Sequence, residues 1–170
     1  NEVEREVIRK DSDFHDGKYL ELNKSPVKGL KAARMLGHIT YLSAKNMDQR
    51  FGRKLQSTDS KIAEDVDFEI ENYLQYKGGK FAESFDANSY ILLTKVMDKF
   101  DIAHGYEDSL ETALENIAAE VLVVSFTTDW MFPPSNGKEI CLASIKANNK
   151  CSYIELELSL IHISEPTRPS

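Results

Sequence analysis

The residue with the clearest chemical potential in this sequence is Asp129, which lies just beyond the run Glu120–Phe126 (EVLVVSF). A continuous β-branched run of this kind is typical of a parallel strand that is buried on both faces. In α/β sheets, reactive groups lie where the carboxyl ends of the strands meet the loops. Asp129 is therefore a candidate for the acid of a Ser–His–Asp triad, in which the carboxylate orients the histidine. The alternative is a turn former or a cap for the next helix.

Two further side chains invite a functional interpretation. Arg34 lies in the apolar stretch AARML, where a guanidinium is costly to bury unless it binds a carboxylate or a phosphate. A surface arginine whose stem covers apolar neighbours is the alternative. His38 follows on the same expected helix, and there a packing histidine is favoured over a catalytic one. The acidic stretch 11–17 matches a calcium loop only in part, because Leu22 stands where the bidentate glutamate belongs, so a solvated turn is favoured and no metal site is predicted.

Helices that precede Asp129 are expected from apolar residues at helical spacing, with turn formers between them. Asp86 is the expected N-cap of one helix, and Asp108 with Glu111 forms a capping-box-like start for another. Gly78 and Gly79 are expected to separate two short helical pieces. The expected helices cover residues 1–10, 29–46, 68–76, 81–85, 87–99 and 108–117, with a charged connection over 48–67.

After residue 119 the hydrophobic pattern changes to that of a β-loop-α-β unit. The strand Glu120–Phe126 is followed by a helix that is expected to be capped by Ser135 or Asn136 and to end near Ala147, and then by the strand Cys151–Glu157. The predicted fold class is thus α/β, with about 120 residues of helices before the last strands of a sheet. These strands are too few for a complete sheet.

Composition excludes several classes of function. The chain has 170 residues, 41% of them hydrophobic and 29% charged, which is the profile of one globular unit. Its net charge of −7 argues against a nucleic-acid partner. The longest apolar run, Val121–Phe126, is far shorter than the roughly 20 residues that span a bilayer, so no membrane role is expected. Cys141 and Cys151 cannot form a disulfide framework, and the cytoplasm is the expected compartment.

Both ends of the chain are unusual. The sequence begins with Asn1 in what reads as a helix already under way, which suggests a chain cut upstream. At the other end, the segment LSLIHISEPTR (158–168) resembles the in-frame translation of a sequencing adapter. Residues 158–170 are therefore predicted to be a non-native tail, and His162 is excluded from any catalytic scheme. The alternative is a genuine C-terminal strand.

Five segments resemble, in order, the homoserine O-acyltransferases of the α/β-hydrolase superfamily: NEVEREVIRKDSDFHDGKY, GLKAARMLGHITYLS, FGR, ENYLQYKGGKFAESFDANSYILLTK and VVSFTTDWMFPP. The resemblance covers essentially residues 1–157. It implies the α/β-hydrolase fold, here only a helical lid region (1–118) and the C-terminal part of the hydrolase core (119–157). The family's lid helices also imply a homodimer.

The resemblance assigns roles to individual residues. Asp129 matches the family's triad acid, Arg34 matches an arginine that binds the carboxylate of homoserine, and Tyr41 lies beside the same site. The family's nucleophilic serine would precede Asn1, and its histidine would follow Glu157. Two of the three triad members are then absent from this chain, which is expected to be inactive as it stands.

The resemblance also implies the reaction. Members transfer an acyl group from acyl-CoA to the hydroxyl of L-homoserine in methionine biosynthesis, by a ping-pong mechanism through an acyl-serine, without a metal or redox cofactor. Members that use succinyl-CoA tend to carry an arginine two residues after the acid; Met131 stands there, so acetyl-CoA is expected as the co-substrate. The alternatives are succinyl transfer, serine as the acceptor, or a non-catalytic dimerising lid module.

Overall fold

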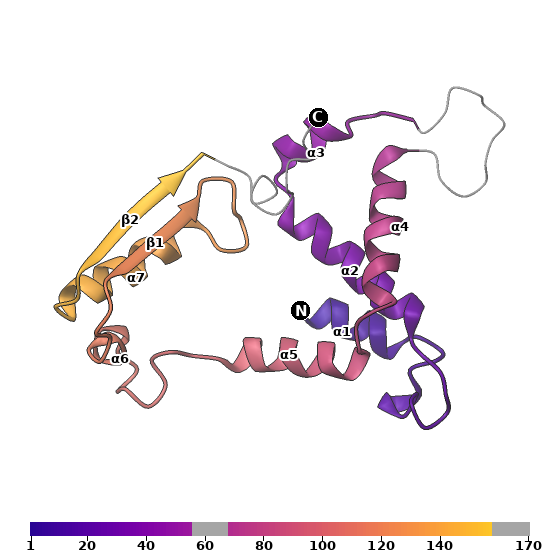
Figure 1. The fold of residues 1–170 in the computed structure, drawn as a ribbon, viewed down its shortest axis with the longest axis horizontal. Helices are drawn as coiled ribbons and strands as arrows, with labels where there is room; N and C mark the ends of the chain where they lie inside the picture. Colours follow the sequence, from indigo (N-terminus) through magenta and orange to yellow (C-terminus); the bar gives the residue numbers. More distant parts are fainter. Residues whose placement is uncertain (56–67, 158–170) are drawn as a thin grey trace. The chain divides into compact units, whose positions relative to one another are not determined.

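A computed structural model describes residues 1–55 and 68–157 (Figure 1). Contacts divide the described chain into two compact units, one of residues 1–40 with 44–99 and one of residues 41–43 with the part from Phe100 onward. The predicted non-native tail at 158–170, with His162, lies outside the described residues, as does most of the expected polar connection. Each unit is described by itself below.

The first unit is helical. Its elements are α1 (Glu2–Arg9), the 3₁₀ turn η1 (His15–Gly17), α2 (Val27–Tyr41), α3 (Ala44–Arg50), α4 (Glu69–Ala82) and α5 (Ala87–Lys99). Its core consists of buried side chains from these helices and the loops between them: Ile8, Phe14, Tyr19, Leu30, Ala33, Ala82, Ala87 and Ile91. The start of α5 is as predicted, because the Asp86 carboxylate accepts a hydrogen bond from the Ser89 amide at 2.7 Å.

One predicted break in this unit is wrong. Gly78 and Gly79 do not separate two helical pieces, because α4 runs through both without interruption. Gly78 is needed for packing, since a Cβ there would lie 2.8 Å from the Lys31 carbonyl oxygen and 3.0 Å from Met35 Cγ. Close approach of α2 and α4 therefore explains a glycine that the sequence alone suggested was a helix breaker.

The two adjacent glycines provide a matched pair of substitutions. Gly78→Ala should destabilise the protein by about 1–3 kcal/mol, because its Cβ would collide with the α2 backbone. Gly79→Ala should stabilise it by about 0.5–1 kcal/mol, because alanine favours the helix and, apart from the adjacent residues and the backbone of α4 itself, no described heavy atom lies within 4 Å of the added Cβ. Chemical denaturation of both variants measures this, and equal shifts of the same sign would contradict the packing at Gly78.

The second unit contains the predicted β-α-β arrangement. Strand β1 (Val121–Phe126) pairs in parallel with β2 (Cys151–Leu156), with Val121 opposite Cys151, and α7 (Pro134–Lys146) connects them. The short helix α6 (Leu110–Leu114) falls inside the predicted lid region but contacts this unit, since Glu111 on α6 pairs with Lys146 on α7 at 2.5 Å.

Two helix starts differ from prediction. Ser109, rather than Asp108, caps α6, because its hydroxyl accepts a hydrogen bond from the Thr112 amide at 3.2 Å. Helix α7 begins at Pro134 instead of after a Ser135 or Asn136 cap. Proline is well suited to the first position of a helix, where its missing N–H would have no intrahelical partner.

The face of the sheet that α7 covers carries the odd-numbered side chains of β1. A Cβ on Gly137 would lie 3.2 Å from Val123 Cγ1 and would also meet the Ser125 hydroxyl. Side chains alternate along a strand, so Leu122 and Val124 point to the other face, where they are 60% and 43% exposed. The expected burial of β1 on both faces is therefore not found within the described residues.

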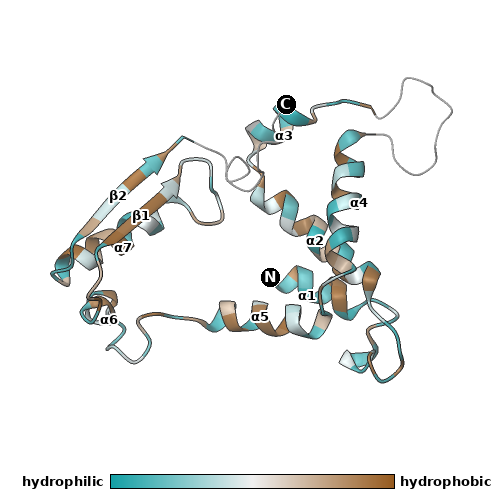
Figure 2. Cartoon of the chain, in the orientation of Figure 1, coloured by the Kyte–Doolittle hydropathy of each residue, from teal (hydrophilic) through white to brown (hydrophobic). Residues whose placement is uncertain are grey.

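Helix α5 carries several apolar residues, which are coloured brown in Figure 2. The exposed side chains recur at helical spacing and belong to Leu92, Leu93, Val96, Met97 and, just past the helix, Phe100. The opposite side of α5 contributes Ala87 and Ile91 to the core of the first unit. The helix thus buries one face within its own unit and leaves a second apolar face uncovered by the described residues.

Candidate active site

Asp129 lies in the loop that leaves the carboxyl end of β1, as the sequence predicted. Its Oδ1 accepts hydrogen bonds from the amides of Met131 at 3.0 Å and Phe132 at 2.8 Å. Its own amide donates to the Phe126 carbonyl at 3.1 Å. The carboxylate therefore both shapes a tight turn and is fixed by it. Oδ2 makes no hydrogen bond to any described residue, so one oxygen is available to orient another group.

Arg34 and Tyr41 lie on α2, two turns apart. The Arg34 guanidinium is half-buried and stacks over the ring of Phe81, with its Cζ 4.9 Å from the ring centroid. Within the described parts of the chain, no carboxylate lies within ion-pair distance of it. A guanidinium on an aromatic ring without an anion is suited to binding a carboxylate from a ligand. Tyr41, the last residue of α2, is exposed.

His38 packs against the edge of Tyr73, with ring centroids 5.6 Å apart and the Tyr73 hydroxyl 3.4 Å from His38 Nδ1. Burial, and after it the positive charges of Arg34 and Lys77, lower the pKa of His38 to about 4. The imidazole is therefore neutral at pH 7. This environment fits the predicted packing role. The pKa of His38 is also sensitive to the positive charges of Arg34 and Lys77 beside it.

Lys77 has no signal in the sequence, yet its positive charge acts on His38 together with that of Arg34. Its side chain is half-buried on α4, and its Nζ lies 5.7 Å from the centroid of the Tyr73 ring. The guanidinium of Arg50 lies over the same ring, with its Cζ 4.9 Å from the centroid. A lysine in a polar helical segment carries no local signal, because the histidine and the arginine beside it in the fold belong to another helix.

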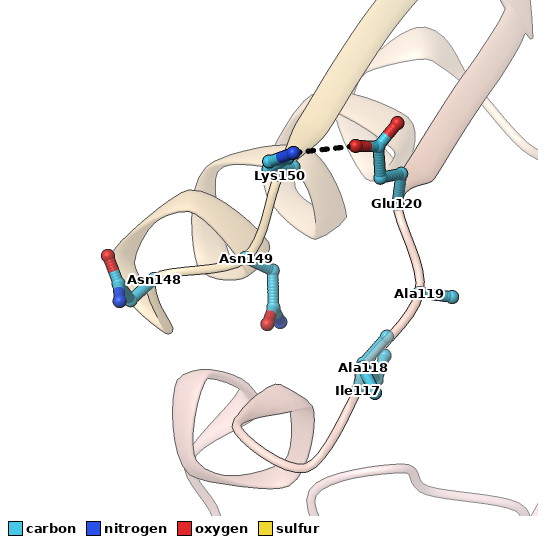
Figure 3. Close-up of a pocket in the computed structure, with 7 residues that line it drawn as sticks. All are labelled: Ile117, Ala118, Ala119, Glu120, Asn148, Asn149 and Lys150. Atoms are coloured by element: carbon cyan, nitrogen blue, oxygen red, sulfur yellow. Dashed lines mark hydrogen bonds and ion pairs between the residues drawn. The ribbon is translucent and has the colours of Figure 1, made fainter.

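The predicted residues are shared between the two units. Arg34 and His38 belong to the first unit, whereas Tyr41 and Asp129 belong to the second. A pocket in the second unit is lined by residues 117–120 and 148–150, where Lys150 pairs with Glu120 at 2.8 Å (Figure 3). It lies at the amino ends of β1 and β2, so it does not include Asp129 at the opposite end of β1.

No group of three or more His, Cys, Asp or Glu side chains that could hold a metal ion occurs in residues 1–55 and 68–157. In those same residues, no helix combines the length and apolar character that crossing a membrane requires.

Solved structures identify the fold. A homoserine O-acetyltransferase from Bacillus anthracis superposes with a TM-score of 0.76 at 26% identity, covering 92% of this chain and 41% of that one. An esterase at 23% identity superposes with a TM-score of 0.74, covering 94% of this chain and 43% of the other. The chain therefore has part of the α/β-hydrolase fold, as predicted, namely its helices and a two-stranded parallel portion of the sheet.

Within that fold, the chain is similar to homoserine O-acyltransferases. A homoserine O-succinyltransferase from Ralstonia nicotianae is 48% identical over 157 residues, which are 92% of this chain and 39% of the relative. Another from Litchfieldella anticariensis is 49% identical over 154 residues, which are 91% of this chain and 40% of the relative. The chain thus spans about two fifths of the length of these relatives. A scan against models of protein families gives no match.

Proposed function

We propose that this chain is part of a homoserine O-acyltransferase, which transfers an acyl group from acyl-CoA to the hydroxyl of L-homoserine. The observation that carries the proposal is the identity of 48% with a curated homoserine O-succinyltransferase over 92% of the chain. The position of Asp129 at the carboxyl end of β1 supports it, because reactive groups of α/β folds gather at that end.

In the proposed mechanism, this chain supplies the acid of the triad and the acceptor's carboxylate site. Asp129 orients a histidine and stabilises its protonated form while that histidine activates a serine. The serine attacks the thioester, and CoA leaves as the thiol with the proton that the histidine took from the serine. The histidine then takes the proton of the homoserine hydroxyl as it attacks the acyl-serine, and it returns that proton to the serine as the acyl-serine bond breaks. Arg34 binds the carboxylate of homoserine, with Tyr41 beside it. The proposal assigns neither the serine nor the histidine to a residue that the structure describes.

For the acyl donor, we give precedence to succinyl-CoA over the acetyl-CoA that the sequence favours. Met131 stands two residues after Asp129, where it offers no charge to a second carboxylate, and this was the basis for acetyl. The curated relatives from Ralstonia nicotianae and Litchfieldella anticariensis are both named succinyltransferases. Identity of 48–49% along nearly the whole chain outweighs the chemistry of one side chain.

The test is a steady-state assay of the protein encoded by the whole reading frame that contains this chain. CoA release is followed with succinyl-CoA or acetyl-CoA as the donor and L-homoserine or L-serine as the acceptor. The proposal predicts the highest kcat/KM for succinyl-CoA with L-homoserine. Preference for acetyl-CoA would restore the donor predicted from Met131, and preference for serine would replace the acceptor. No transfer with any pair would overturn the proposed function.

A dimerising role remains the second proposal, from a different class. The exposed apolar stripe on α5 supports it, because contiguous apolar surface of this kind often marks a protein–protein contact. The two roles are compatible, since a lid helix can bind a second copy while the same protein catalyses acyl transfer.

A further inference from the structure

Helices α2 and α4 bring together two series of side chains, each spaced one turn apart. Arg34 and His38 on α2 face Phe81 and Tyr73 on α4, respectively. Lys77 lies one turn from both Tyr73 and Phe81 on α4, so it lies between the two pairs. These five residues form what we call the α2–α4 seam. The close approach at Gly78 holds the two helices together there.

The seam holds two cations that have no described anionic partner. Each of the two lies over an aromatic ring instead: Arg34 Cζ is 4.9 Å from the centroid of the Phe81 ring, and Lys77 Nζ is 5.7 Å from the centroid of the Tyr73 ring. Two other cations of this unit have anionic partners, since Arg5 pairs with Asp98 at 2.6 Å and Lys80 pairs with Glu83 at 3.6 Å. Burying a cation in part without an anion beside it costs free energy. The chain has a net charge of −7, yet no carboxylate of a described residue pairs with either cation.

The seam also has a built-in reporter of its own charge. His38 is faced by Arg34 on its own helix and by Tyr73 and Lys77 on α4, and Arg50 on α3 lies on the Tyr73 ring. None of these groups is acidic near pH 7. An anion bound between Arg34 and Lys77 would cancel part of the positive field at the imidazole. Protonation of His38 would then become easier, and its pKa would rise.

We propose that Lys77 is a second cation of the acceptor site, which together with Arg34 binds the carboxylate of the amino-acid acceptor at the α2–α4 seam. The identity of the ligand rests on the proposed function; the two-cation site rests on the seam itself. Two cations on opposite helices bind a carboxylate from both sides, which both attracts the ligand and fixes the direction in which it lies. Lys77 thus helps to select an acceptor that carries an α-carboxylate over an alcohol that has no charge.

The experiment follows the imidazole of His38 by NMR in the protein from the whole reading frame, labelled at histidine and assigned with His38→Gln. Saturating L-homoserine should raise the His38 pKa, whereas the analogue with CH₂OH in place of the carboxylate should not. In Lys77→Met, the pKa should be raised before ligand is added, and homoserine should shift it less. Its KM for homoserine should rise about tenfold with little change in kcat.

Matched variants separate charge from packing. Lys80→Met removes an exposed lysine of the same helix and should leave both the His38 response and the KM unchanged. Lys77→Arg keeps the charge and should retain the homoserine response. A His38 shift caused by CoA, and not by homoserine, would assign the seam to donor phosphates and overturn the carboxylate proposal.

The outcomes also distinguish this inference from the proposed function. Suppose that the protein transfers an acyl group to homoserine but Lys77→Met behaves like Lys80→Met. The proposed function then stands, and Lys77 is not part of the acceptor site. If the carboxylate of homoserine raises the pKa of His38 in a protein that transfers no acyl group, the two-cation site stands and the proposed function fails.

Discussion

Replacing Asp129 with asparagine should lower kcat for acyl transfer by about 10⁴-fold, as expected for a triad acid. The structure makes this a clean substitution. The asparagine side-chain oxygen can accept the same two amide hydrogen bonds, from Met131 at 3.0 Å and Phe132 at 2.8 Å, so the turn keeps its shape. The second carboxylate oxygen becomes an NH₂ donor, which favours the wrong histidine tautomer. Steady-state kinetics of the protein from the whole reading frame measures the loss.

Asp101 provides the control, because its Oδ1 also accepts an amide hydrogen bond two residues ahead, from Ala103 at 2.9 Å. Asp101→Asn should leave kcat unchanged. If Asp129→Asn stays within a few-fold of wild type while it folds normally, Asp129 is only a turn former. Loss of activity together with a lower melting temperature in Asp129→Asn alone would likewise point to a structural role.

Elements whose local sequence signals agree with their tertiary packing could be predicted from the sequence. Helix α5 begins and ends where predicted, because the Asp86 cap and an apolar periodicity both define it. Strand β1 is predicted from its β-branched run, and its parallel pairing with β2 follows from the helix that connects them. Helix α4 was divided wrongly, because the reason for Gly78 lies in α2, which is more than thirty residues away in the chain.

The same distinction applies to the candidate site. Asp129 could be predicted because its significance depends on position relative to its own strand. Arg34 could be noticed because it interrupts an apolar stretch. Lys77 could not, because a lysine in a polar helical segment is ordinary until another helix supplies the second cation and the histidine beside it. Sites made by single elements are visible in sequence, whereas sites made between helices require the packing.

Replacing Arg34 with leucine should raise KM for L-homoserine by about 10- to 100-fold, which corresponds to losing a charge-assisted hydrogen-bonded pair. The first half-reaction should survive, because serine acylation by acyl-CoA does not involve the acceptor. A rapid-quench measurement of acyl-enzyme formation, alongside steady-state KM, separates the two steps. Leucine also covers the Phe81 ring that the guanidinium now covers at 4.9 Å, so the packing of α2 on α4 should be retained.

Lys28→Leu removes an exposed positive charge from the first turn of the same helix and is the matched control for net charge. It should leave both steps unchanged. Slow acyl-enzyme formation in Arg34→Leu with an unaltered homoserine KM would place Arg34 on the donor side of the reaction.

The double variant of Arg34→Leu with Lys77→Met tests whether the two cations act on one ligand. If they bind the same carboxylate, the increase in homoserine KM in the double variant should be smaller than the product of the two single increases, since the second loss acts on a ligand that is already weakly bound.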